Sequence, residues 1–350
     1  MRKTTLLLGL TLVIAALALT ACAGAEGPAG PVGPAGPAGP AGPAGEVVAA
    51  DLSCTECHNN TTLILSKEGQ FRETSVHGTG ESFIRGEEGS CAGCHGTEGV
   101  VARISAGLPP HDASVVGVTN VSPFDCRTCH QIHTSYTGAD WALTGNAAPV
   151  KLEYTAGTYD GGSGNLCANC HQIRNAAPKV EGGNVSITSS RYGTHYGVES
   201  QMMLGEGALG VTGTPSIHYA GIEGTCVACH MGEDANHTYE PEAARCQACH
   251  ADAENFDING TQTEIEGMLE ELHTIFVDKK LLNPETDLWG IYDAAAGKFS
   301  NPSADKPLVV PEATANAMWN YKFVTYDASM GVHNSAYAKA ILEAALEAMK

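Results

Sequence analysis

Aromatic and basic side chains are both scarce in this chain of 350 residues. Phe, Trp and Tyr make up 6% of the sequence, so the protein has few of the large apolar side chains that usually fill a core. Lys and Arg number 19 against 39 Asp and Glu, which gives a formal charge of −20. This charge argues against nucleic acid as a partner and favours a cationic protein or an oxide surface.

Cysteine is almost absent outside one repeated motif. The pattern Cys-x-x-Cys-His occurs six times and uses twelve of the thirteen cysteines, so no pair remains for a structural disulfide. The six copies are Cys54/Cys57/His58, Cys91/Cys94/His95, Cys126/Cys129/His130, Cys167/Cys170/His171, Cys226/Cys229/His230 and Cys246/Cys249/His250.

The motif is typical of covalent attachment of a c-type haem. Two thiols three positions apart can each add to one vinyl group of a porphyrin, and the adjacent imidazole then lies under the iron as its proximal ligand. Zinc or a redox dithiol is the alternative, but neither requires a histidine after the second cysteine of every copy. We therefore predict six haem c groups, which would also supply the flat apolar surface that the scarce aromatic residues do not.

The start of the chain predicts export. Arg2 and Lys3 precede an apolar run from Leu6 to Leu19 that is too short to span a bilayer with its flanks, so residues 1–21 are interpreted as a signal peptide. The sequence before Cys22 resembles the lipobox of bacterial lipoproteins, in which the cysteine is lipidated, and plain cleavage after Ala21 is the alternative. Ala23 in the next position indicates an outer-membrane destination, on the periplasmic or the cell-surface side.

Residues 22–45 combine this lipidated cysteine with a collagen-like tract. Glycine recurs at every third position from Gly27 to Gly45, mostly followed by proline. A trimeric triple helix is one interpretation, and a polyproline II spacer that holds the protein roughly 60 Å from the membrane is the favoured one.

The rest of the chain predicts a multihaem cytochrome c fold. Residues 46–255 carry the motifs between Gly-, Asn- and Ser-rich stretches, which favours loops and short α-helices packed on haems, little β structure and a short hairpin near Val185. Residues 256–350 predict a C-terminal helical cap. Apolar residues have helical spacing in 262–280 and 334–350, and a third helix is expected in 313–326.

Each iron needs a second axial ligand, and eight histidines lie outside the motifs. His133 follows His130 by three positions, so on a helical turn the two imidazoles are neighbours that serve adjacent haems. His237 lies between the fifth and sixth motifs and is expected to serve one of them. The histidines placed beside glycine or another small residue, which lets a porphyrin approach the backbone, are His77, His195 and His218.

The motif arrangement resembles the multihaem cytochromes c. The resemblance is carried by Cys226–Met231 with His237, by Cys246–His250, by Gly331–Asn334 before the last helix, and by Cys126–His133 with Trp141. It is closest to the outer-surface cytochromes of metal-reducing bacteria and more distant to the pentahaem nitrite reductases and octahaem hydroxylamine-oxidising enzymes. The resemblance implies that His333, which the cap supplies, is also a distal ligand. Nothing comparable assigns His111 or His273.

Two functions follow from the distal ligands. If His77, His133, His195, His218, His237 and His333 fill all six positions, the protein is an electron carrier between a periplasmic or membrane donor and an extracellular acceptor. The alternative is a nitrite or hydroxylamine oxidoreductase, or its electron-donor subunit, which needs an open iron. The nitrite reductases have lysine in place of the motif histidine at their catalytic haem. All six motifs of this chain end in histidine, which argues against that kind of site. The resemblance also allows a homo-oligomer or filament in which one subunit donates a histidine to the next.

Overall fold

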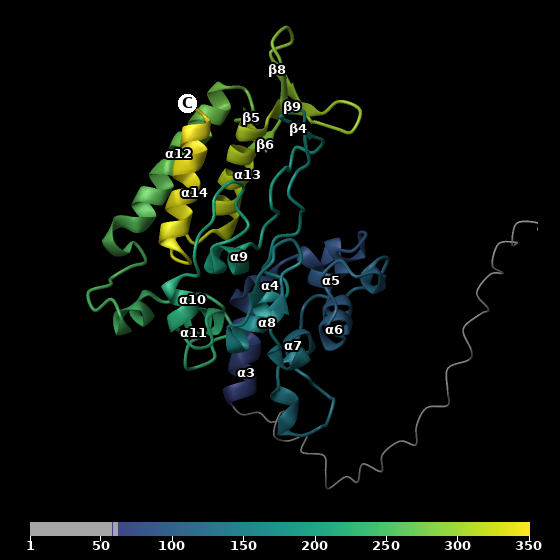
Figure 1. Ribbon diagram of the computed structural model, residues 1–350. Helices are drawn as coiled ribbons and strands as arrows, with labels where there is room; N and C mark the ends of the chain where they lie inside the picture. The colour runs from purple at the N-terminus through teal and green to yellow at the C-terminus, as the bar shows by residue number, and fades with distance from the viewer. Residues whose placement is uncertain (1–57, 59–61) are drawn as a thin grey trace, which may run out of the picture. The chain divides into compact units, whose positions relative to one another are not determined.

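The computed structural model describes residue 58 and residues 62–350, and these lie within one compact unit. The predicted signal peptide, Cys22, the spacer, Cys54 and Cys57 lie outside the described residues. Helices, turns and loops dominate, and the strands are short, which confirms the predicted mixture of helices and loops with little sheet (Figure 1).

Short helices occupy the part of the chain that carries the motifs. They are α3 Thr62–Gly69, α4 Val76–Thr79, α5 Ala92–His95, α6 Thr97–Ser105, α7 Cys126–Cys129, α8 Asn165–Ala168, α9 Glu199–Leu204, α10 Ile217–Gly221 and α11 Cys226–His230. The chain also has one π-helical segment, η3 Gln70–Thr74, and short 3₁₀ segments at η4 Ser82–Glu87, η5 Ala113–Val115, η6 Gly138–Trp141, η7 Thr144–Ala147, η8 Gly162–Gly164, η9 Ala243–Ala248 and η10 Ile258–Gly260.

The strands form small antiparallel pairs. β1 Val150–Lys151 pairs with β2 Thr158–Tyr159, β5 Leu282–Asn283 with β6 Leu288–Trp289, and β7 Ile291–Asp293 with β8 Lys298–Ser300. The predicted hairpin is β3 Val180–Glu181 with β4 Asn184–Ile187, and β9 Leu308–Pro311 adds a third strand to it. Gly182 and Gly183 connect β3 to β4 with φ of 57° and 78°, which suits the two-residue turn that favours glycine.

Three long helices form the C-terminal cap, at the three places where the sequence predicts helices. α12 spans Thr261–Asp278, α13 spans Glu312–Asp327 and α14 spans Ser335–Ala348. α13 and α12 both pack on α14, and the three lie together in Figure 1. α12 buries Ile265, Leu269, Leu272 and Phe276 on one face. The cap is not purely helical, because the short β5–β6 and β7–β8 hairpins, which apolar periodicity does not predict, lie between α12 and β9.

The largest apolar core belongs to the cap and its neighbours. Phe276 meets Trp289 and Tyr321 edge to face, at 5.1 and 5.4 Å between ring centroids. Residues from before the cap, such as Ile187 and Met202, also enter this core. Aromatic residues are thus concentrated here, where the chain can bury them without a cofactor.

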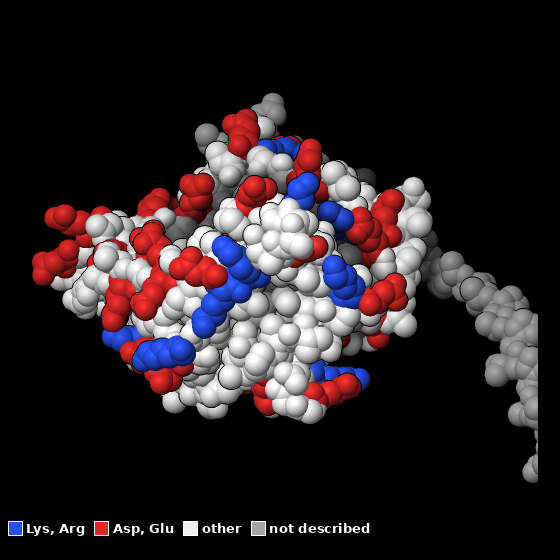
Figure 2. Space-filling view, turned by 90° about the horizontal axis from the view of Figure 1, so that it is seen from above, with Lys and Arg blue, Asp and Glu red and all other residues white. Residues whose placement is uncertain are grey.

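Charge is unevenly distributed on the surface. Figure 2 shows the face that lies at the top of Figure 1, and acidic side chains gather along its edge, most densely at the left.

Within the described part of the chain, no helix is long and apolar enough to cross a membrane.

Candidate functional site

Each described Cys-x-x-Cys-His motif lies on or beside a helical turn. The motifs fall at α5, α7, α8, α11 and η9. In four of them the histidine N–H donates to the carbonyl of the first cysteine at 2.8–2.9 Å, namely in His95, His130, His171 and His250. A helical turn places residues three and four apart on one face, so both thiols and the imidazole of a motif face the same side.

Among the described motifs, the sixth has the most exposed second cysteine. η9 ends at Ala248, so Cys249 lies just outside the turn, as its C-cap, with φ of −119° and ψ of −28°. Cys249 is exposed, together with Gln247 and Ala248 before it, whereas Cys94, Cys129, Cys170 and Cys229 are all half-buried. The helical turn at this motif therefore ends before Cys249, because the 3₁₀ segment is short and lies at the surface. The thioether at Cys249 stays a prediction.

Every motif histidine lies against one histidine from outside the motifs. The six pairs, numbered by motif, are site 1 His58 and His133, site 2 His95 and His195, site 3 His130 and His237, site 4 His171 and His77, site 5 His230 and His333, and site 6 His250 and His218. The ring centroids in these pairs are 6.0–6.4 Å apart. The non-motif members are the six histidines that the sequence predicts as distal ligands.

This separation suits one metal ion between two imidazoles. A ligating nitrogen lies about 2 Å from its metal and about 1 Å from its own ring centre, so two imidazoles on opposite sides of one ion have centroids ~6 Å apart. Direct ring stacking has no need for so uniform a distance in six separate pairs. No group of three or more His, Cys, Asp or Glu side chains in the described residues could hold an ion, so the histidines meet in twos.

Hydrogen-bond acceptors beside Nδ1 determine which ring nitrogen carries the proton in seven of these histidines. Backbone carbonyls lie 2.7–3.0 Å from Nδ1 of His130, His195, His218, His230 and His237. A carbonyl only accepts, so Nδ1 carries the proton and Nε2 keeps its lone pair. That is the tautomer of a metal-ligating histidine whose second nitrogen is held by the protein.

Carboxylates take the place of the carbonyl at two sites. Nδ1 of His171 lies 3.1 Å from Oε2 of Glu199, and Nδ1 of His333 lies 2.7 Å from Oδ1 of Asp327. Glu199 raises the pKa of His171 to about 9. Burial lowers the pKa of His333, but Asp327 outweighs it and raises this pKa to about 9. Sites 4 and 5 therefore have a largely buried anion behind one imidazole, which increases the basicity of that ligand.

The remaining shifts favour neutral imidazoles. Burial lowers the pKa of His77 to about 4, and it also lowers the pKa of His95, His195 and His237. A neutral imidazole is the form that binds a metal. These donors fit the iron of a c-type haem, which supplies reversible one-electron chemistry when bound.

Backbone strain marks two of the non-motif histidines. His133 and His195 have φ of 63° and 70°, in the left-handed region that residues with a side chain rarely adopt. Such conformations persist where the surrounding structure determines them, and they concentrate at functional sites. The strain identifies these two positions as ones where the direction of the imidazole matters.

Sites 1 and 3 are neighbours because one loop supplies both. The expected helical turn between His130 and His133 is absent: α7 ends at Cys129, and His130 is extended, with φ of −121° and ψ of 155°. The two imidazoles still face different partners, 6.3 Å from His237 and 6.0 Å from His58.

Tyr239 connects sites 3, 4 and 5. Its ring lies 6.0 Å from that of His237 and 5.0 Å from that of His77, measured between centroids. Its carbonyl accepts from Nδ1 of His230 at 2.8 Å.

Site 6 adjoins site 5 through consecutive residues. The carbonyl of Val332 accepts from Nδ1 of His218 at 2.7 Å, while the next residue, His333, faces His230 at 6.3 Å. Site 2 adjoins site 4, since Nη2 of Arg103 lies 3.8 Å from Sγ of Cys94 and 3.4 Å from Sγ of Cys170. The contacts thus run 1–3–4–5–6, with site 2 as a branch at site 4.

One pairing differs from expectation, since His237 lies in sequence between the fifth and sixth motifs but faces His130 of the third. His77, whose partner was not predicted, precedes the second motif and faces His171 of the fourth. Long loops without periodicity allow these reversals. Sequence reasoning also missed Glu199, Asp327 and Tyr239, because an isolated acid or tyrosine in a loop carries no motif.

The two unassigned histidines face acids instead of imidazoles. Nδ1 of His111 pairs with Glu153, and its Nε2 lies 3.1 Å from Nη2 of Arg174. Nε2 of His273 lies 3.5 Å from Oδ1 of Asp287.

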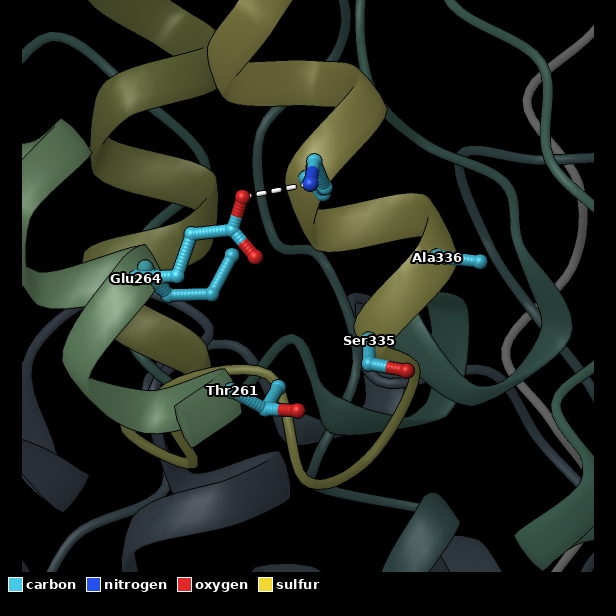
Figure 3. A pocket seen from close by; sticks show the side chains of 6 residues that line it. Thr261, Glu264, Ser335 and Ala336 are labelled. Atoms are coloured by element: carbon cyan, nitrogen blue, oxygen red, sulfur yellow. Dashed lines mark hydrogen bonds and ion pairs between the residues drawn. The ribbon is translucent and has the colours of Figure 1, made fainter. Parts of the chain in front are cut away.

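The cavities lie apart from these pairs or beside one of them. A pocket of about 150 Å³ between α12 and α14 is lined by Thr261, Glu264, Ser335 and Ala336, among others, and contains no histidine or cysteine (Figure 3). A groove of about 820 Å³ runs beside His195 of site 2. Neither is a separate catalytic cleft with convergent acid groups.

Comparison with known proteins gives one similar structure to report. No protein-family model matches the chain, and no curated protein matches it. The chain is similar to the crystal structure of an outer cell wall cytochrome, OcwA, with 20% sequence identity and a TM-score of 0.49. The match covers 81% of this chain and 50% of that one, so the chain spans half the length of that protein.

Proposed function

We propose that the chain is a hexahaem c-type cytochrome that carries electrons between a periplasmic or membrane donor and an extracellular acceptor or partner. The observation that carries this proposal is the set of six histidine pairs. Each pair joins a motif histidine to one other histidine at 6.0–6.4 Å between ring centroids. An iron held between two protein imidazoles has no free position for a substrate.

The same observation argues against the nitrogen-oxide oxidoreductase. Reduction of nitrite or oxidation of hydroxylamine at haem needs one iron with an open coordination position and acid groups around it. Here the second position of every site has a histidine available from the same chain. Paired imidazoles also give lower potentials than histidine with methionine, which suits an anaerobic respiratory carrier.

The contiguity of the sites supports transport through the protein. Each site adjoins at least one other through a shared loop or a shared residue, and the row has three ends, at sites 1, 2 and 6. His58 and His133 of site 1 are both exposed, so this end is accessible to a redox partner. In this proposal the lipid on Cys22 and the spacer hold the protein at the outer membrane.

Exchange of histidines between subunits is not required. All six motif histidines have partners in their own chain, and His111 and His273 are engaged by acids. If the protein forms filaments, we expect them to be held by surface contacts rather than by a donated ligand.

The test is haem content together with electron paramagnetic resonance of the oxidised protein. We expect six haems per chain, all low-spin, and no change when nitrite, hydroxylamine or cyanide is added. Crossed imidazole planes leave the iron d orbitals nearly equal in energy and parallel planes separate them, so two classes of signal are expected. The planes cross at 70°, 68° and 78° at sites 2, 4 and 6 but at only 22° and 30° at sites 1 and 3.

A high-spin haem in the wild-type protein, together with turnover of nitrite or hydroxylamine, would overturn the assignment. Fewer than six haems would show that one of the motifs serves another purpose.

A further inference from the structure

Arg103 is a buried cation between two of the sites. It lies on α6 between the second and third motifs, and 1% of its surface is exposed. Ionised side chains are almost never buried to this degree unless they are paired. The groups that surround Arg103 should therefore explain why it is buried.

The guanidinium contacts both site 2 and site 4. Its Nη2 lies 3.8 Å from Sγ of Cys94 and 3.4 Å from Sγ of Cys170. It also donates to the Asn169 carbonyl at 2.7 Å, and its Nε donates to the carbonyl of Gly93. All these partners belong to the second and fourth motifs, so one side chain joins the attachment edges of two haems.

No carboxylate neutralises this charge. None of the ion pairs among the described residues includes Arg103, and its acceptors are neutral carbonyl, amide and sulfur atoms. Burial keeps the field of an unneutralised charge from being screened by water.

Site 4 has an anion beside its motif histidine, since Oε2 of Glu199 lies 3.1 Å from Nδ1 of His171. At site 2, Nδ1 of His195 faces the neutral carbonyl of Tyr196 instead, at 3.0 Å. The fixed charges therefore become more positive from site 4 toward site 2.

We propose that Arg103 is a potential-setting residue that raises the reduction potentials of the haems at sites 2 and 4 and directs electrons into the site 2 branch. A reduced haem carries one electron more than an oxidised one, so a fixed cation at its edge favours the reduced state. This inference rests on the proposed function, since it requires haem at both sites.

The experiment compares four variants by haem content and by a redox titration of the intact protein, followed optically and by electron paramagnetic resonance. Arg103→Gln removes the charge and keeps hydrogen-bond donors, whereas Arg103→Lys keeps the charge. Asn169→Asp leaves Arg103 in place and sets a carboxylate beside it, because Oδ1 of Asn169 already lies 3.3 Å from Nη1. Arg85→Gln is the matched control, at an exposed arginine paired with Glu88.

We expect two of the six midpoint potentials, those of sites 2 and 4, to fall in Arg103→Gln and in Asn169→Asp. The paramagnetic resonance signals that follow these two potentials should both be of the kind given by crossed imidazole planes. Arg103→Lys should stay near the wild type, and Arg85→Gln should not change. Unmoved potentials with six haems retained overturn the inference, as does an equal shift in Arg103→Lys and Arg103→Gln, which indicates a packing effect. If Arg103→Gln does not load haem, Asn169→Asp decides alone. A wild-type protein with fewer than six haems counts against the proposed function instead.

Discussion

His130 and His133 lie three residues apart in one loop and direct their imidazoles at two different partners. His130 faces His237, and His133 faces His58. The left-handed backbone of His133 turns its side chain away from the site that His130 serves. One short loop thereby links two of the histidine pairs, so a change at one position can be tested without removing the other.

Replacement of His133 by Ala should open site 1 alone. The iron held by His58 then loses its distal ligand, and a high-spin signal should appear in about one haem of six, with added imidazole restoring the low-spin form. His111→Ala is the control, because His111 faces Glu153 and no second imidazole. An unchanged spectrum in His133→Ala would mean that site 1 takes its second ligand from elsewhere.

Replacement of Glu199 by Gln should raise the potential of the haem at site 4. The carboxylate behind His171 makes the imidazole more electron-rich and favours the oxidised iron, so its removal should shift the potential upward by ~50 mV, about 1 kcal/mol for one electron. Glu153→Gln alters a similar histidine–carboxylate contact at His111, outside the pairs, and should have no effect. A shift in both variants would indicate a general charge effect.

Haem attachment should stabilise the body more than the cap. Replacing Cys167 and Cys170 by Ala removes the proposed attachment at site 4, which adjoins site 2 through Arg103 and sites 3 and 5 through Tyr239. By hydrogen exchange, amides in residues 64–250 should lose protection, while those in α12, α13 and α14 keep it because this part has its own apolar core. Full protection of the body after loss of one haem would contradict the proposed dependence on the cofactor.

Phe276→Ala should destabilise the cap without changing the haem spectrum. Phe276 is fully buried against Trp289 and Tyr321, and loss of such a side chain costs about 3–5 kcal/mol. Chemical denaturation followed by tryptophan fluorescence measures the loss. Phe299→Ala should change stability much less, since Phe299 is only half-buried and lies on the β8 strand outside this core.

Cys22→Ser should abolish lipidation. Metabolic labelling with a fatty acid is expected to mark the wild-type protein only, and the variant should appear in the soluble fraction, because one missing diacyl group removes the stable anchor. Equal labelling of both proteins contradicts the lipoprotein assignment.

The cap was predictable because its helices follow a simple period. Apolar residues recur at helical spacing at Ile265, Leu269, Leu272 and Phe276. Helix α12 begins one residue before the start of the predicted range and ends two residues before its end. The hairpins within the cap were not predictable, since strands of two or three residues are too short to show an alternation.

The histidines themselves could be chosen from the sequence, but their pairing could not. The six distal candidates are the six that meet motif histidines, because six irons need six ligands and the motifs fix one side of each. Which candidate meets which motif depends on loops, as His77 and His171 illustrate. The exposure of Cys249 was equally hidden, because the five-residue motif is the same in every copy and only the path of the chain around it differs. Arg103 gave no signal either, since an arginine on a short helix is usually exposed.

The junction of Val332 and His333 affects the order in which the protein matures. His333 serves site 5, whose motif ends 103 positions earlier at His230, and Val332 serves site 6, whose motif ends 82 positions earlier at His250. A polypeptide that emerges N-terminus first presents those thiols for haem attachment well before the end of the chain arrives. In the proposed haem protein, the distal ligand of site 5 therefore arrives only with the C-terminus, whereas site 6 already has His218 and gains from Val332 the carbonyl that orients it. A prematurely terminated chain would leave site 5 with its haem attached but without its second ligand.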